Sequence, residues 1–156
     1  MKIEQLFTGC LAEMAYYIES NGEAAVVDPL RETEPYLQMA EADGAKIKYI
    51  FLTHFHADFV SGQYDLARKT GAKIVFGPNA TTEYNIYNGA DGEDFFVGKG
   101  KITLLHTPGH TMESSSYLIT DEDGNTPCIL TGDALFIGDV GRPDLAVKED
   151  ALTEED

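Results

Sequence analysis

The histidines are the residues best suited to chemistry, and all four of them fall into two pairs. His54 and His56 are followed by Asp58, and His106 is followed by His110. A solitary histidine is usually a surface or core residue, but alternate residues of an extended segment point to one side, so two imidazoles and a carboxylate come close together. Imidazole nitrogen and carboxylate oxygen are common ligands of transition metals. The spacing therefore predicts a metal site.

Two further motifs would complete such a site. His110 follows the turn Pro108-Gly109, where a fixed proline φ and a permissive glycine can aim the side chain back into a cleft. Gly132-Asp133 ends another apolar run and delivers a carboxylate at a strand terminus. Each motif alone is more often structural than catalytic, but together they predict that three loops converge on one metal.

These loops need strands and helices to position them. Thr33 is expected to cap a helix that ends near Gly44, and a second helix is expected to stop at Gly71. Asn21-Gly22 is typical of a hairpin turn. Residues 78–94 are expected to form a long excursion. Alternating or continuous apolar character predicts strands over residues 3–8, 15–20, 23–28, 46–53, 73–76, 95–97, 102–105, 115–120 and 128–131.

The composition restricts the class of protein. The 156 residues suit one domain, and 43% hydrophobic with 24% charged residues is typical of a globular protein. A net charge of -16 argues against binding to nucleic acid or to an anionic membrane surface. No apolar run is long enough for a membrane span or a secretory signal, so a cytoplasmic location is expected. Cys10 and Cys128 are expected to be reduced and buried.

The three motifs, residues 53–58, 107–110 and 131–133, together resemble the metallo-β-lactamase superfamily. The resemblance implies an α/β (α+β) fold, an αββα sandwich that carries its metal at one edge of the two sheets. Residues 1–156 would be one such domain, corresponding to the N-terminal two-thirds of the sandwich and incomplete at the C-terminus, with no rhodanese domain. Either the missing portion or association into a homo-oligomer would then cover the open face.

The rest of the match is similar to the persulfide dioxygenase branch, particularly its bacterial members with rhodanese domains. The stretch 132–144 and the pair Ser61-Gly62 carry this likeness. It implies one Fe(II) per chain, with zinc an alternative in the purified protein, and it implies His54, His110 and Asp133 as the catalytic metal ligands. The implied substrates are a small-molecule thiol persulfide and O₂, with sulfite and the free thiol as products.

The resemblance also implies roles around these ligands. His56 would be a further ligand or a neighbour of the site, and Asp58 would orient a ligand or a bound water. His106 would support the site or be structural. Arg142 either binds the anionic thiol carrier or pairs with a neighbouring carboxylate in its own loop.

Two alternatives to the dioxygenase remain open. One is a hydrolase of thioesters or lactones, similar to glyoxalase II. The superfamily signature HxHxDH has a histidine after the aspartate, which is similar in role to a ligand of the second metal in such hydrolases, but this chain has Phe59. The other alternative is an inactive metal-binding fragment.

Overall fold

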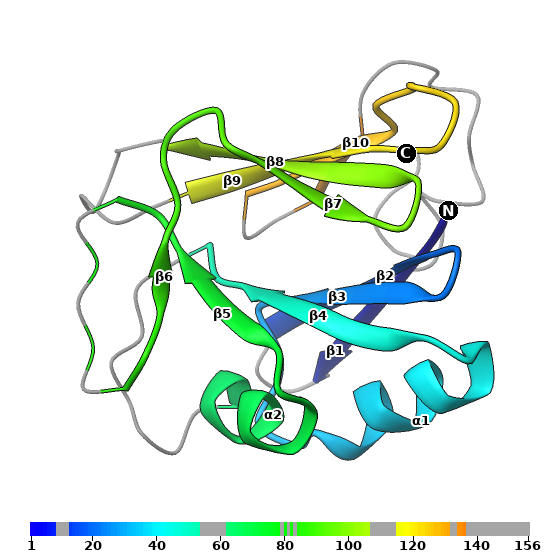
Figure 1. Ribbon diagram of the computed structural model, residues 1–156, viewed down its shortest axis with the longest axis vertical. Coiled ribbons are helices and arrows are strands. Elements are labelled where there is room, and N and C mark those ends of the chain that lie inside the picture. Colours follow the sequence, from blue (N-terminus) through cyan, green and yellow to red (C-terminus); the bar gives the residue numbers. More distant parts are fainter. Residues whose placement is uncertain are drawn as a thin grey trace.

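The computed structural model describes residues 1–8, 13–53, 62–78, 80, 82, 84–106, 115–131 and 134–136. They form two β-sheets that pack face to face, with two helices below the first sheet (Figure 1). The first sheet has the strand order β1-β2-β3-β4-β5-β6, with bounds Lys2–Thr8, Glu13–Ser20, Glu23–Val27, Lys46–Phe51, Lys73–Phe76 and Tyr87–Asn88. The second has the order β11-β10-β9-β8-β7, with bounds Ala134–Phe136, Cys128–Leu130, Ser115–Thr120, Gly100–His106 and Asp94–Val97.

The first sheet begins with antiparallel strands and continues with parallel ones. β2 and β3 form the predicted hairpin, whose turn residues Asn21 and Gly22 have φ of 51° and 87°. Both angles are positive, as a two-residue hairpin turn of this kind requires. From β3 to β6 the strands are parallel, so the chain must cross over between them, and the first two crossovers contain the helices.

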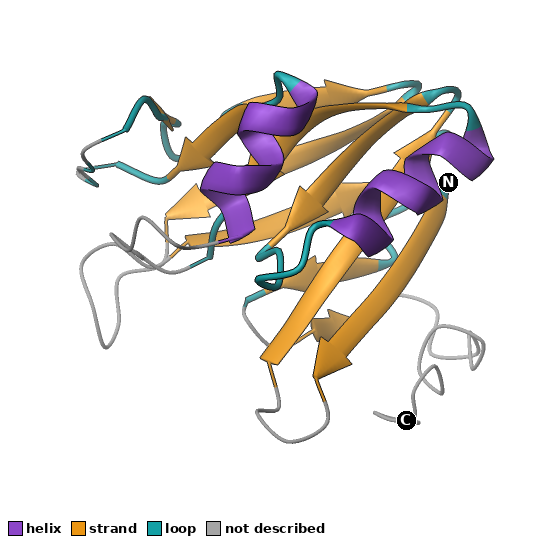
Figure 2. Ribbon diagram, turned by 90° about the horizontal axis from the view of Figure 1, so that it is seen from below, coloured by secondary structure: helices purple, strands orange, loops and turns teal. Residues whose placement is uncertain are grey.

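The helices α1 (Glu34–Asp43) and α2 (Gly62–Thr70) both cover the outer face of the first sheet (Figure 2). α1 ends at Gly44 in the left-handed conformation, as predicted. Thr33 is its N-cap residue, but its hydroxyl does not cap the helix and instead accepts a hydrogen bond from Lys69 Nζ at 2.9 Å. Neither described helix has the length and apolar character needed to cross a membrane.

Each face of the first sheet has its own apolar core. Residues that alternate along the strands separate the two: Tyr16 faces the second sheet, whereas Tyr17 faces the helices. Both tyrosines are buried core residues. Cys128 is also buried and unbridged between the sheets, as expected. The sandwich is thus held by apolar packing on both faces of its central layer.

The predicted strands are present, most of them with an end shifted by one or two residues, and the structure adds two short strands. The excursion contains the short strand β6, and β11 follows a segment predicted only as a motif. His106 was expected just past its strand, but it is the last residue of β8. The strands β6 and β11 each pair with a neighbouring strand over only two or three residues, so their sequence pattern is too short to predict a strand.

Candidate metal centre

The loops that carry the predicted ligands leave the sandwich at one edge. β4 and β8 end there, β9 begins there, and β10 pairs with β9 so that Leu130 lies opposite Tyr117. The segment with His54 follows β4, the segment with His110 joins β8 to β9, and Asp133 follows β10. The end of β8 and the start of β9 lie at the left of Figure 1.

Hydrogen bonds between the two sheets hold these strand ends together. The backbone N–H of Ser115, the first residue of β9, donates to the carbonyl of Thr53 at 2.9 Å. The Tyr117 hydroxyl donates to the carbonyl of Leu52 at 2.7 Å. Through these two bonds the residue directly before His54 is fixed to the strand that follows the His110 segment. The starting points of the three loops are therefore held together by described residues alone.

Asp28 completes the anchoring of Thr53. It follows β3 with a φ of 52°, and its Oδ1 and Oδ2 accept hydrogen bonds from the backbone N–H of Thr53 at 2.8 Å and from its hydroxyl at 2.5 Å. Thr53 is fully buried, so its N–H, hydroxyl and carbonyl are all bonded within the protein. This role of Asp28 was not predicted from the sequence. An acid directly after a strand that pairs with β4 is the signal that would have indicated it.

The buried tyrosines next to this anchor remain uncharged. Burial raises the pKa of Tyr117 well above its usual value, and the nearby charge of Asp28 raises it further. Burial likewise raises the pKa of Tyr36 to about 12, although the backbone N–H of Leu30 donates to its hydroxyl oxygen at 2.7 Å and acts in the opposite direction. Both hydroxyls therefore stay protonated and act as hydrogen-bonding groups of this frame.

His106 and Ser115 face each other across β8 and β9 at the same edge. The Nδ1 atom of His106 and the Oγ atom of Ser115 are buried, and neither has a hydrogen-bond partner among the described residues. Their backbones are engaged, because His106 N–H donates to Asp91 Oδ1 at 2.9 Å and Ser115 N–H donates to Thr53. Two polar side chains are thus directed into the sandwich without a partner in its frame.

This arrangement fits a metal centre at the edge. Buried polar atoms normally find partners, so two adjacent unpaired ones indicate that other polar groups complete them. The two histidines and the aspartate predicted for the adjoining segments would form a nitrogen and oxygen donor set that suits iron or zinc. In the part of the chain that the structure describes, no three His, Cys, Asp or Glu side chains are grouped to hold a metal.

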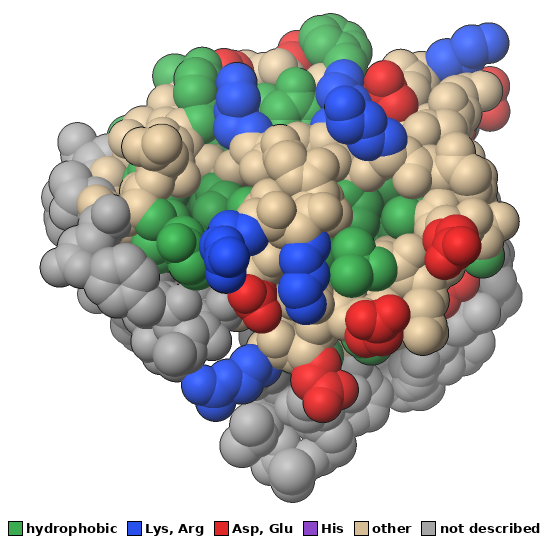
Figure 3. All heavy atoms as spheres, turned by 60° about the horizontal axis from the view of Figure 1, so that its bottom comes forward, with side chains coloured by type: hydrophobic (Ala, Val, Ile, Leu, Met, Phe, Trp, Pro, Cys, Tyr) green, Lys and Arg blue, Asp and Glu red, His purple; other side chains and the backbone are tan. Residues whose placement is uncertain are grey.

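A shallow hollow elsewhere on the surface has a different character. It lies between α2, the start of β5 and the segment before β6, and basic side chains stand beside hydrophobic ones on this helical face (Figure 3). The guanidinium carbon of Arg68 lies 5.9 Å from the ring centre of Tyr64, and Lys73 Nζ lies 5.0 Å from the ring centre of Tyr87. These cation–π contacts already account for the basic side chains of the hollow.

Of the predicted site residues, the structure describes His106 only. The others lie outside the described residues, and so does Phe59: they are His54, His56, Asp58, His110, Asp133 and Arg142. Their predicted roles remain predictions, as does that of Cys10. What the structure adds is the common edge from which their segments start.

Comparison with known proteins identifies relatives over most of the chain. Residues 8–154 match the model of the metallo-beta-lactamase superfamily. The cytoplasmic hydroxyacylglutathione hydrolase of Arabidopsis thaliana is 33% identical over 138 residues, which are 85% of this chain and 53% of that protein. The chain therefore spans about half the length of this curated relative.

Two solved structures are similar in fold and sequence. A metallo-beta-lactamase from Staphylococcus aureus superposes with a TM-score of 0.68 and 35% identity, covering 83% of this chain and 41% of that one. ETHE1 from Myxococcus xanthus has a TM-score of 0.67 and 31% identity, covering 76% of this chain and 54% of the other. The predicted sandwich fold is thus confirmed, over the N-terminal part of these relatives.

Proposed function

Because the chain belongs to the metallo-β-lactamase superfamily, we propose that it is a metal-dependent enzyme of the persulfide dioxygenase branch, acting in the cytoplasm on a low-molecular-weight thiol persulfide. The proposed reaction converts R-S-SH, O₂ and water into R-SH and sulfite. The atoms balance with the release of two protons: O₂ and water supply the three oxygens of sulfite, and the outer sulfur leaves the thiol.

The convergence of three strand ends at one edge carries this proposal. The bonds from Ser115 to Thr53 and from Tyr117 to Leu52 join the start of the His54 segment to the end of the His110 segment. The pairing of β10 with β9 places the start of the Asp133 segment beside them, so the three segments can bring their side chains to one point. The preorganised frame matters because a metal ligand must be held in a narrow range of positions.

In the proposed site His54, His110 and Asp133 hold Fe(II), with His56 as a further ligand or neighbour. Two imidazoles and one carboxylate are the donor set of non-haem iron oxygenases, and iron bound in this way supplies the redox chemistry by which O₂ reacts with an organic substrate. The remaining side chains of the chain do the positioning. Asp58 would orient a ligand, and Arg142 would bind the negative charge of the thiol carrier.

A hydrolase acting on a thioester is the second candidate. The 33% identity to hydroxyacylglutathione hydrolase supports it, as the 31% identity to ETHE1 supports the dioxygenase. Phe59 favours the dioxygenase. The dinuclear hydrolases have a histidine at the corresponding position, and a phenylalanine cannot bind a second metal ion there.

Activity assays on the anaerobically purified chain separate the two candidates. We expect oxygen consumption and sulfite formation with glutathione persulfide after loading with Fe(II), and no cleavage of S-lactoylglutathione after loading with zinc. Thioester cleavage with two zinc ions per chain and no oxygen consumption would replace the dioxygenase with the hydrolase. Phe59→His is a useful comparison, because it supplies the missing imidazole and should not increase sulfite formation.

A further inference from the structure

The inward-facing rows of β8 and β9 change character at the edge of the sandwich. Along β8 the inward positions are Ile102, Leu104 and then His106, and along β9 they are Ile119, Tyr117 and then Ser115. The apolar core between the sheets therefore ends in two polar side chains that lie opposite each other. Water-facing residues would explain polarity at an edge, but Ser115 is only 2% exposed, and the Nδ1 atom of the half-buried His106 is shielded from water.

The fold itself does not use these two polar groups. Ser115 Oγ and His106 Nδ1 are buried without partners among the described residues, while the backbone groups of both residues are bonded. The first sheet also makes room for the hydroxyl, because a Cβ atom at Gly77 would overlap Ser115 Oγ. A buried polar group without a partner destabilises a fold, so such a pair persists where something else requires it.

We propose that His106 and Ser115 form a polar floor beneath the metal centre and act as positioning residues, hydrogen-bonding to the groups that assemble around the metal. This inference rests on the proposed metal centre, but not on whether that centre performs dioxygenase or hydrolase chemistry. The imidazole Nδ1 can donate or accept depending on its tautomer, and the serine hydroxyl can do both. Such supporting hydrogen bonds orient metal ligands and raise metal affinity.

The inference predicts that metal affinity and the stability of the metal-free protein respond in opposite ways to Ser115→Ala. Removing an unpaired hydroxyl should leave the urea midpoint of the metal-free chain unchanged or higher. Affinity for Zn²⁺, measured by competition with a chelator, should fall about 10- to 100-fold. The visible absorption of the Co²⁺-loaded variant should also change, since the ligands are less well oriented.

Ser20→Ala is the matched control. Ser20 is equally buried, at the opposite end of the sandwich, but its hydroxyl donates to Glu122 Oε2 at 2.6 Å and accepts from the backbone N–H of Lys99 at 3.3 Å. Loss of these bonds should lower the urea midpoint without changing Zn²⁺ affinity or the Co²⁺ spectrum.

His106 offers a test by conservative rescue. His106→Leu should weaken Zn²⁺ binding about 10-fold or more, whereas His106→Asn should bind nearly as well as the wild type, because an asparagine amide atom can stand where Nδ1 stands.

Two results would overturn the inference. If Ser115→Ala and His106→Leu bind Zn²⁺ as tightly as the wild type and lower the urea midpoint like Ser20→Ala, the residues are structural, and the proposed metal centre is unaffected. If the wild-type chain binds neither Zn²⁺ nor Fe²⁺, the floor has no metal centre to support and the proposed function fails with it.

Discussion

The two ends of the sandwich differ in how their buried polar side chains are hydrogen-bonded. At one end, the β2–β3 hairpin, the β7–β8 turn and the turn after β9 meet, at the right of Figure 1. At the other end, β4, β8 and β10 send out the segments with the predicted ligands. At both ends, hydrogen bonds join the two sheets. Of these two ends, only the second has buried side-chain atoms without a hydrogen-bond partner among the described residues, namely His106 Nδ1 and Ser115 Oγ.

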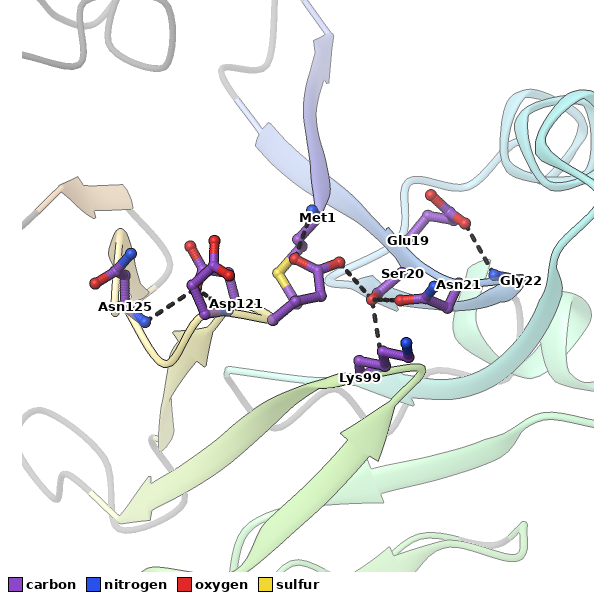
Figure 4. Close-up of polar contacts among 10 residues, drawn as sticks. Met1, Glu19, Ser20, Asn21, Gly22, Lys99, Asp121 and Asn125 are labelled. Carbon is purple, nitrogen blue, oxygen red and sulfur yellow. Dashed lines mark hydrogen bonds and ion pairs between the residues drawn. The ribbon is translucent and has the colours of Figure 1, made fainter.

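The first end, which we call the closed end, is formed by residues 19–22, 97–100 and 121–125 together with Met1. Its polar groups satisfy one another (Figure 4). The amino group of Met1 donates to Glu122 Oε1 at 2.7 Å and Ser20 Oγ donates to Glu122 Oε2 at 2.6 Å. Asp121 Oδ1 accepts from the backbone N–H of Asn125 at 2.9 Å, which closes the turn.

The difference between the ends indicates which polar side chains complete the frame of the sandwich and which are left for the proposed metal centre. At the closed end, the completed hydrogen-bond network holds the two sheets together and stabilises the fold. At the ligand end, by contrast, Asp28 and Thr53 fix the backbone, while the inward side chains are left for the proposed metal centre. Substitutions at the two ends should accordingly differ in what they change.

Replacing Asp28 is expected to have the largest effect on stability. Asp28→Ala removes both acceptors of buried Thr53, and hydrogen bonds to a charged group contribute about 1.5–3 kcal/mol each, so the free energy of unfolding should fall by about 3 kcal/mol or more. Urea denaturation measures the change. Asp28→Asn should cost less, because asparagine tolerates the positive φ and keeps one acceptor. Equal losses in the two variants would show that the carboxylate bonds are not the cause.

Replacing Gly77 tests the close approach of the two sheets at the ligand end. Gly77→Ala places a Cβ against Ser115 Oγ and should cost about 1–3 kcal/mol, as overpacking does. Adding Ser115→Ala removes the overlapping atom, so the double variant should recover most of this loss in a double-mutant cycle. Additive effects would mean that the clash lies elsewhere.

Replacing Glu122 tests the closed end and should have the smallest effect. The Met1 amino group and the Ser20 hydroxyl lower the pKa of Glu122 to about 2 from its ordinary 4.5. Since the folded pKa is the lower one, this stabilisation is complete above the unfolded pKa and is lost as the pH falls from about 4.5 towards 2.

Glu122→Gln should therefore lower the free energy of unfolding by about 1 kcal/mol at pH 7, as expected for a partly exposed pair. The difference from the wild type should vanish near pH 2. Unfolding curves between pH 2 and pH 7 measure it, and Zn²⁺ affinity at pH 7 should be the same for both proteins. A constant difference at all pH values would contradict the role of this ion pair.

Much of the fold is predictable from local patterns. Asn21-Gly22 specified a hairpin turn, and the apolar run before Thr53 specified a strand with both faces covered, because these signals depend on neighbouring residues only. The two-residue strand β6 lacks such a signal, since its pairing with β5 arises from the tertiary arrangement.

The ligand types of the candidate site are a prediction from the sequence, whereas the residues that support the site are seen only in the structure. Histidines and an aspartate after strands indicate a metal, whereas Asp28 and Ser115 are ordinary residues in sequence. Asp28 matters because it binds Thr53, which lies 25 residues later in the chain. Ser115 matters because it binds Thr53 from the other sheet. Only the assembled sandwich shows that these positions frame one edge.

The metal content of the wild-type chain and of Asp133→Ala, after both are loaded with Fe²⁺ without oxygen and then desalted, tests the central claim most directly. If three loops bring two imidazoles and one carboxylate to a single point, we expect about one iron per wild-type chain. We then expect almost none in the variant, with its metal-free stability little changed. Equal iron in both proteins, or two ions per wild-type chain, would contradict the account.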